Sequence, residues 1–154
     1  MMSIWAGGAL LVCGGGLAPL VLSAAQALQW ERDSLARGQA VLLAQDLSHR
    51  LHLNASTPDP YQLAWGQTPP SLSCRDRPCS RTEWAQSDLA IWRAQLTTLL
   101  PDGDAWLQGS GSGDTHRWLV LAWASGGGSE SVTPSRLPVS CPAGKRCLAV
   151  VLCP

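Results

Sequence analysis

Hydrophobic and polar positions divide the chain into an uncharged N-terminal run, an amphipathic stretch and a mixed C-terminal part. Residues 4–28 contain no charged side chain. At about 1.5 Å per residue, such a run is long enough to cross a hydrocarbon core of about 30 Å as a helix. The pattern therefore predicts a membrane-anchor helix over residues 1–28.

The uncharged run passes into an amphipathic stretch, residues 29–54, with no turn signal between them. Its apolar residues recur at helical spacing, which predicts that they share one face. These are Leu28, Leu35, Ala36, Ala40, Leu43, Ala44, Leu47 and Leu51. We therefore expect one long helix whose second half offers an apolar stripe to a globular domain, ended by Asn54, Pro58 and Pro60.

A connecting loop over residues 55–80 precedes a second predicted helix over residues 80–100. Ser80 and Glu83 have the spacing of a capping box, in which each side chain bonds to the other's backbone N–H. The expected buried stripe is Ala85, Leu89, Trp92, Leu96 and Leu99. Within the preceding loop, residues 61–65 alternate and predict a short edge strand.

After residue 103 the hydrophobic period changes to two, which indicates strands. The candidates are residues 104–108, 117–124 and 147–152, within a C-terminal part spanning 104–154. The expected fold class is therefore α+β, with the long N-terminal helix packed with a second helix on a small antiparallel sheet. Residues 29–154 would form one domain.

Six cysteines favour an oxidising compartment. Cys74 and Cys79 enclose a short loop and are predicted to pair. If residues 147–153 are extended, the cysteines at their ends lie about 20 Å apart, whereas bonded cysteines need Cα atoms within about 7 Å. Cys141 is then the better partner for Cys147, and Cys153 is left over as a free or intermolecular thiol.

With these elements in place, the sequence resembles the type IV pilins, and most closely the PilV-type minor pilins. The motifs are A-L-L-V at residues 9–12, L-L-A-Q-D-L-S-H-R-L-H-L-N at 42–54, and C-R-D-R-P-C at 74–79. A helix at 85–103 then ends in L-P-D-G. In this family a hydrophobic helix continues into an amphipathic one, and a cysteine pair precedes a second helix. The resemblance implies the pilin architecture for the domain.

The resemblance also implies a function. The protein would be a minor pilin-like subunit, not an enzyme, that takes part in type IV pilus assembly or priming. It would be a single-pass protein of the bacterial inner membrane with a periplasmic domain, incorporated in the pilus. Its partners would be other minor pilins, the major pilin, the inner-membrane assembly machinery and the lipid bilayer. The residues expected to carry assembly are Ala9, Leu10, Leu11, Val12, Gly15, Gly16 and Pro19.

The N-terminus departs from the family pattern and leaves alternatives open. Prepilins carry a basic leader, a cleavage-site glycine and an early glutamate, whereas here Trp5 falls at the glutamate's position. Either the start lies upstream, or this member is not processed in the usual way. A signal peptide cut near Ala27 would instead give a secreted disulfide-bonded binding module. A secretion-system pseudopilin would share the fold and differ in its partners.

Composition and candidate chemistry add little that points to catalysis or to a cofactor. The formal net charge is zero, so we expect no direct nucleic-acid binding. His49 and His52 are three residues apart but lack obvious further metal ligands. Asp102, Asp104 and Asp114 flank a glycine-rich turn without the pattern of a calcium loop.

Eight tryptophans form a further unusual feature. Trp84 and Trp92 share the second predicted helix, and Trp118 and Trp123 have opposite parity on one predicted strand. One member of each pair is therefore expected to be exposed. An exposed tryptophan would indicate a subunit contact, since aromatic side chains are enriched at interface centres.

Overall fold

The computed structural model describes residues 6–54, 61–109, 116–124 and 137–153, with the side chains of the first helix described from residue 23 onward. The elements are α1 (Ala6–Leu53), α2 (Arg81–Leu99), β1 (Asp104–Gly109), β2 (Arg117–Ala124) and β3 (Lys145–Leu152). The strands form an antiparallel sheet of order β1-β2-β3. The described part is therefore α+β, with two helices and a small antiparallel sheet, which confirms the predicted fold class at this level.

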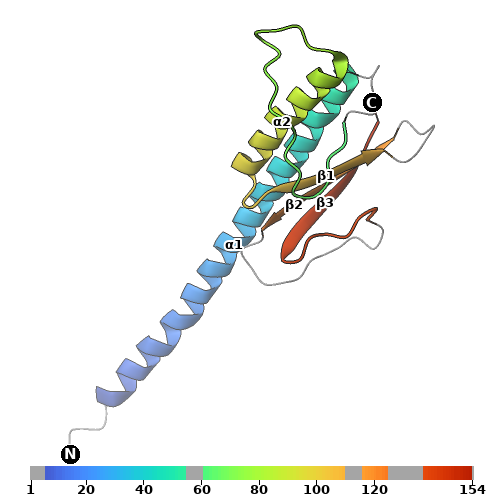
Figure 1. Ribbon diagram of the computed structural model, residues 1–154. Helices are drawn as coiled ribbons and strands as arrows, with labels where there is room; N and C mark the ends of the chain where they lie inside the picture. Colours follow the sequence, from blue (N-terminus) through green and yellow to red (C-terminus); the bar gives the residue numbers. More distant parts are fainter. Residues whose placement is uncertain (1–5, 55–60, 110–115, 125–136, 154) are drawn as a thin grey trace, which may run out of the picture.

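Helix α1 is the longest element. Its 48 residues would extend about 70 Å at about 1.5 Å per residue. The C-terminal part of α1 lies beside α2 and contacts β2 and β3, while the N-terminal part extends away from the sheet (Figure 1). α2 runs back along α1 and contacts β1, so the two helices cover the sheet together. Only the C-terminal part of α1 thus packs within the domain, and its N-terminal part projects beyond it.

The buried face of α1 begins later than the sequence pattern predicts. Ala36, Ala40, Leu43, Ala44, Leu47 and Leu51 are buried in the common core. Leu28 and Leu35 are exposed, so their predicted place on the domain face is wrong. Leu35 and Leu43 are eight residues apart, which separates them by about 80° around a helix of 3.6 residues per turn. Only the side of α1 that carries Leu43 packs against the rest of the domain, and the side that carries Leu35 does not.

Helix α2 begins with the predicted capping box. The Ser80 hydroxyl accepts a hydrogen bond from the Glu83 N–H, and Glu83 accepts one from the Ser80 N–H at 2.8 Å. The Ser80 N–H, followed by the Arg77 guanidinium, lowers the pKa of Glu83 to about 2. At the other end, Leu99 is exposed and Leu100 is buried, which corrects the predicted stripe by one residue. The chain leaves the helix at Leu100, whose backbone is extended.

The sheet carries one continuous apolar ladder toward the helices. Leu107 of β1 lies opposite Leu119 of β2, which in turn lies opposite Val150 of β3. β3 begins at Lys145, two residues before the predicted start. The edge strand predicted near residue 63 is reduced to one antiparallel bridge, in which Leu63 and Leu107 exchange hydrogen bonds of 2.9 and 2.8 Å.

The predicted membrane anchor falls mostly outside the side chains that the structure describes. Among the described residues, no helix has an apolar stretch long enough to span a membrane. The residues expected to carry assembly have backbones within α1, and their side chains lie outside the described part: Ala9, Leu10, Leu11, Val12, Gly15, Gly16 and Pro19.

Candidate functional site

An exposed leucine stripe runs along α1 outside the domain core. Leu28, Leu35 and Leu42 follow one another at seven-residue intervals, and all three are exposed. Seven residues make nearly two turns, so these side chains drift by only about 20° per step and share one face. Gly38 lies within the same stretch, and a side chain placed there would meet nothing within 4 Å. The leucine stripe is thus a row of exposed leucines open to a partner, with Arg32, Gln39 and Asp46 beside it.

A second exposed line on α1 is formed by Trp30 and Val41. Trp30 is 72 % exposed, and Val41 is exposed about one turn before the core residue Ala44. Eleven residues span just over three whole turns, so Trp30 and Val41 lie nearly in line along the helix. Two apolar lines therefore remain on the faces of α1 that the sheet does not cover.

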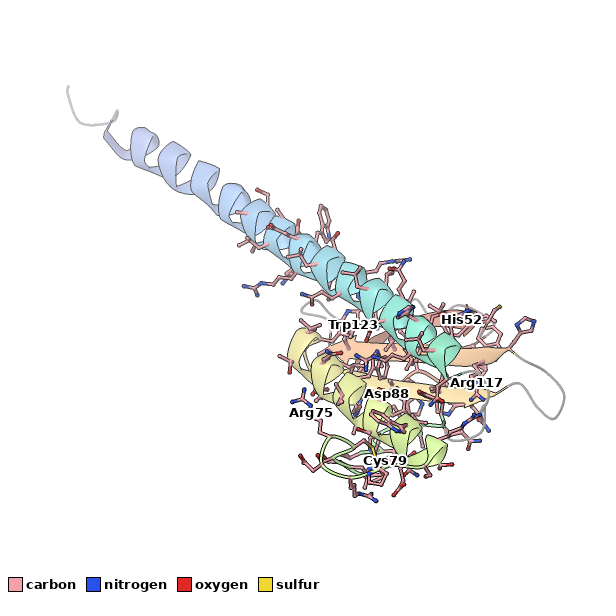
Figure 2. All side chains as sticks on the ribbon, turned by 90° about the horizontal axis from the view of Figure 1, so that it is seen from above. His52, Arg75, Cys79, Asp88, Arg117 and Trp123 are labelled. Carbon is pink, nitrogen blue, oxygen red and sulfur yellow. A yellow bond between two sulfur atoms is a disulfide. The ribbon has the colours of Figure 1, made fainter. Side chains whose placement is uncertain are left out.

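Polar side chains form a network where the end of α1 meets the start of α2. Arg50 Nε pairs with Asp46 at 2.9 Å, one turn back on the same helix, and Arg50 Nη1 reaches Asp88 of α2 at 3.4 Å. The Tyr61 hydroxyl donates to Asp88 Oδ2 at 3.1 Å, and Asn54 Nδ2 donates to that hydroxyl at 3.3 Å. Asp88 lies on α2 at the side facing α1 (Figure 2). The network thus joins both helices to the loop that follows α1.

Tyr61 is fully buried at the inner end of this network. Burial, reinforced by the negative charge of Asp88, raises the pKa of Tyr61 to about 12. Because the phenol stays protonated, its O–H remains a donor to the Asp88 carboxylate at neutral pH. A buried Arg117 fixes the same residue from the sheet side by donating to the Tyr61 carbonyl at 2.9 Å.

The network forms one wall of a groove of about 420 Å³ between α1 and α2, which we call the α1–α2 groove. Its lining residues are Asp46, His49, Arg50, Leu53, Asn54, Arg81, Trp84 and Asp88. Trp84 is 48 % exposed, and Leu53 at the end of α1 is also exposed. The groove therefore combines polar side chains that are fixed by ion pairs and hydrogen bonds with apolar side chains that are exposed to solvent.

The tryptophans divide as predicted on α2, whereas on β2 neither tryptophan is exposed. Trp92 is fully buried, and its Nε1–H donates to the Leu43 carbonyl of α1 at 2.9 Å, whereas Trp84 on the same helix is exposed. On β2, Trp123 is buried in the core and Trp118 is only partly buried. Trp92 thus joins α2 to α1 by packing and a hydrogen bond, whereas Trp84 is exposed and can contact another molecule.

Both predicted cysteine pairs are disulfides. Cys74 is bonded to Cys79 with their Cα atoms 5.5 Å apart, and Cys141 is bonded to Cys147 with a Cα separation of 6.0 Å. Cys153 is an exposed free thiol, with Sγ 3.2 Å from His116 Nδ1. The disulfides tie the loop before α2 and the start of β3, two places that contribute little to the core.

The candidate metal residues do not assemble. His49 and His52 are both exposed, and Asp102 pairs with Lys145 at 2.9 Å while Asp104 pairs with Arg93 at 2.7 Å. Asp114 lies outside the described residues. Within the described ranges, no group of three histidine, cysteine or carboxylate side chains is placed to hold a metal ion. Structural ion pairing accounts for the two described aspartates.

Sequence reasoning missed the polar network and the outward position of Leu42. The pair Arg50 and Asp88 is 38 residues apart, and Tyr61 and Asp88 are 27 apart, so no local spacing connects them. For Leu42, the signal was present in its seven-residue spacing from Leu35. That spacing defines a line distinct from the one through Leu43.

The chain matches no protein-family model, no curated protein and no solved structure. The features that bear on function are therefore those of the chain itself. They are the divided α1 helix with its leucine stripe, the α1–α2 groove and the two disulfides.

Proposed function

We propose that this protein is a minor pilin-like subunit that takes part in type IV pilus assembly or priming. The observation that carries the proposal is the division of α1. One face of α1 from Ala36 onward is buried against α2 and the sheet, while the part before Ala36 extends from the domain, with Leu28 and Leu35 exposed (Figure 1). A helix built this way is suited to packing against neighbouring copies or related subunits.

The physical mechanism is an exchange of surroundings for one helix. As a monomer, the uncharged residues 4–28 would lie in lipid, with the domain on the periplasmic side of the inner membrane. In a filament the same helix would pack against the corresponding helices of the major pilin and other minor pilins. Lipid tails are as apolar as leucine, so close packing drives this transfer more than exclusion of water does. Gly15 and Gly16 would allow that close approach or a local bend.

A paired substitution on the leucine stripe tests the proposal. Leu35 and Leu42 are 62 % and 65 % exposed, so replacing both by lysine should leave the domain folded. We expect the doubly substituted subunit to remain in the membrane fraction but to be lost from sheared surface fibres. The matched control is Ile91→Lys on α2, where a side chain 51 % exposed lies away from the stripe. That variant should enter fibres normally.

Two results would overturn the proposal. One is normal fibre incorporation of the Leu35→Lys, Leu42→Lys subunit. The other comes from the mass of the N-terminal peptide in separated membrane and periplasmic fractions. A soluble chain that begins near Gln26 or Leu28 would show that the hydrophobic run is a signal peptide. That result would contradict the proposed function as a pilus subunit.

A further inference from the structure

The α1–α2 groove is a candidate ligand site that the leucine stripe does not explain. It lies where α1 ends and α2 begins, at the end of the molecule opposite the N-terminus (Figure 1). Its volume of about 420 Å³ falls in the range of small-ligand pockets, about 300–1,000 Å³. The groove is thus large enough for a ligand and remote from the first half of α1.

The charges of the groove favour a neutral ligand. Two carboxylates, Asp46 and Asp88, are matched by two guanidinium groups, Arg50 and Arg81. A ligand with net charge would meet as much repulsion as attraction there. A ligand rich in hydroxyl groups would find both donors and acceptors, because each hydroxyl donates one hydrogen bond and accepts others.

Acceptor capacity remains on both carboxylates. The hydrogen bonds described above use one of about four lone-pair sites on Asp46 and two on Asp88. The side chains of Asp46 and Asp88 are 41 % and 28 % exposed, so solvent reaches them from the groove. Arg50 is held from both sides by these carboxylates. A wall fixed in this way loses little conformational entropy when a ligand binds.

Trp84 supplies the apolar part of the site. Trp84 lines the groove and is about half exposed, so part of its indole is open to a ligand, and an indole N–H can donate a hydrogen bond. A sugar ring likewise combines apolar and polar parts, with C–H groups on one face and hydroxyl groups around its edge. Leu53 adds a further exposed apolar side chain to the same groove.

From these features we propose that the α1–α2 groove binds a short neutral oligosaccharide. Trp84 packs against the C–H face of one ring, and Asp46 and Asp88 accept hydrogen bonds from its hydroxyls. The site is distinct from the leucine stripe because Leu28, Leu35 and Leu42 are not among the residues that line the groove, although His49 follows Leu42 at the same seven-residue interval on α1. The Leu35→Lys variant changes a position eleven residues before Asp46, and it should therefore bind the oligosaccharide like the unchanged chain.

The test uses the full-length chain in a zwitterionic detergent, since detergents with sugar head groups would compete. Chitotetraose, cellotetraose and maltotetraose are titrated into the protein in a calorimeter. We expect saturable binding of at least one of them. Trp84→Ala should weaken it about tenfold or more, Trp84→Phe should keep most of it, and Ile91→Ala, an equally exposed site on α2, should leave it unchanged.

Three results would overturn the inference. The first is no heat of binding with any of the three sugars at about 10 mM, a concentration that would reveal dissociation constants as weak as about 1 mM. The second is equal binding by the unchanged chain and Trp84→Ala. The third is loss of fibre incorporation by Trp84→Ala without sugar binding by the unchanged chain, which would assign the groove to a protein partner.

Discussion

The two halves of α1 have the same secondary structure and opposite surroundings. After Ala36, Leu43 and Leu47 are buried against α2 and the sheet, whereas before it Leu28 and Leu35 are exposed. All four are leucines in one unbroken helix. The comparison teaches that helical periodicity identifies lines of apolar residues, while the position of the sheet decides which line is core and which is interface.

Small residues mark the buried half. Ala36, Ala40 and Ala44 recur every four residues and are buried with the leucines of the same face. A row of alanines lets neighbouring elements approach the helix backbone closely. On the opposite, exposed face, leucines recur every seven residues instead, and Gly38 meets open space. The two spacings correspond to a packed face and a free one.

The largest expected effect is at Trp92, which fixes α2 to the buried half. Its side chain is fully buried, and its N–H donates to the Leu43 carbonyl. Trp92→Ala should lower the free energy of unfolding by about 3–5 kcal/mol. Trp30→Ala, at the exposed half, should change it by less than about 0.5 kcal/mol. Denaturant unfolding of the full-length chain measures both variants. Similar losses in the free energy of unfolding would contradict the division of α1 into a buried and an exposed part.

A leucine pair within α1 sharpens the same comparison. Leu47 is fully buried and Leu35 is exposed. Replacement of Leu47 by alanine should cost about 2–5 kcal/mol, because it leaves a cavity. The same replacement at Leu35 should stay within about 0.5 kcal/mol. Thermal unfolding followed by circular dichroism compares them; a large loss at Leu35 would mean that this side chain already contributes to the core.

Tyr61 tests the end of the buried half through pH. It is the chain's one tyrosine, so the tyrosinate absorbance reports it alone. Its pKa rises from 10.0 to about 12 on folding, so its contribution to stability is complete below about pH 10 and is lost as pH rises through about 12. Tyr61→Phe should cost about 1 kcal/mol at neutral pH. A native titration midpoint near 10 would contradict the buried hydrogen-bonded phenol.

The smallest expected effect is at the boundary between the halves. Asp33 pairs with Arg146 of β3 at 3.1 Å, just before the first buried residue of the described helix, Ala36. Asp33→Asn should cost about 0.2–1 kcal/mol and speed amide exchange around residues 30–36. Glu31→Gln makes the same charge change at an exposed neighbouring position and should leave exchange there unaltered. Equal amide-exchange protection of residues 30–36 in the two variants would mean that the Asp33–Arg146 ion pair does not mark the start of the buried part of α1.

Much of the fold could be predicted because its signals are local. The Ser80–Glu83 capping box lies within four consecutive residues, and the cysteine pairs are five and six residues apart. The parity of Trp118 and Trp123 follows from the two-residue repeat of a strand. The errors also have local causes, since the predicted stripes were extended past the contacts that bury them, at Leu35 on α1 and Leu99 on α2.

The sequence by itself determined where the helices and strands form, how α2 is capped and which cysteines pair, because neighbouring residues decide each of these. Only the tertiary structure decided that α1 divides near Ala36 and that Arg50 and Tyr61 meet at Asp88. Such contacts depend on how helices and sheet lie in space. No periodicity along the chain encodes a distance between residues 38 positions apart.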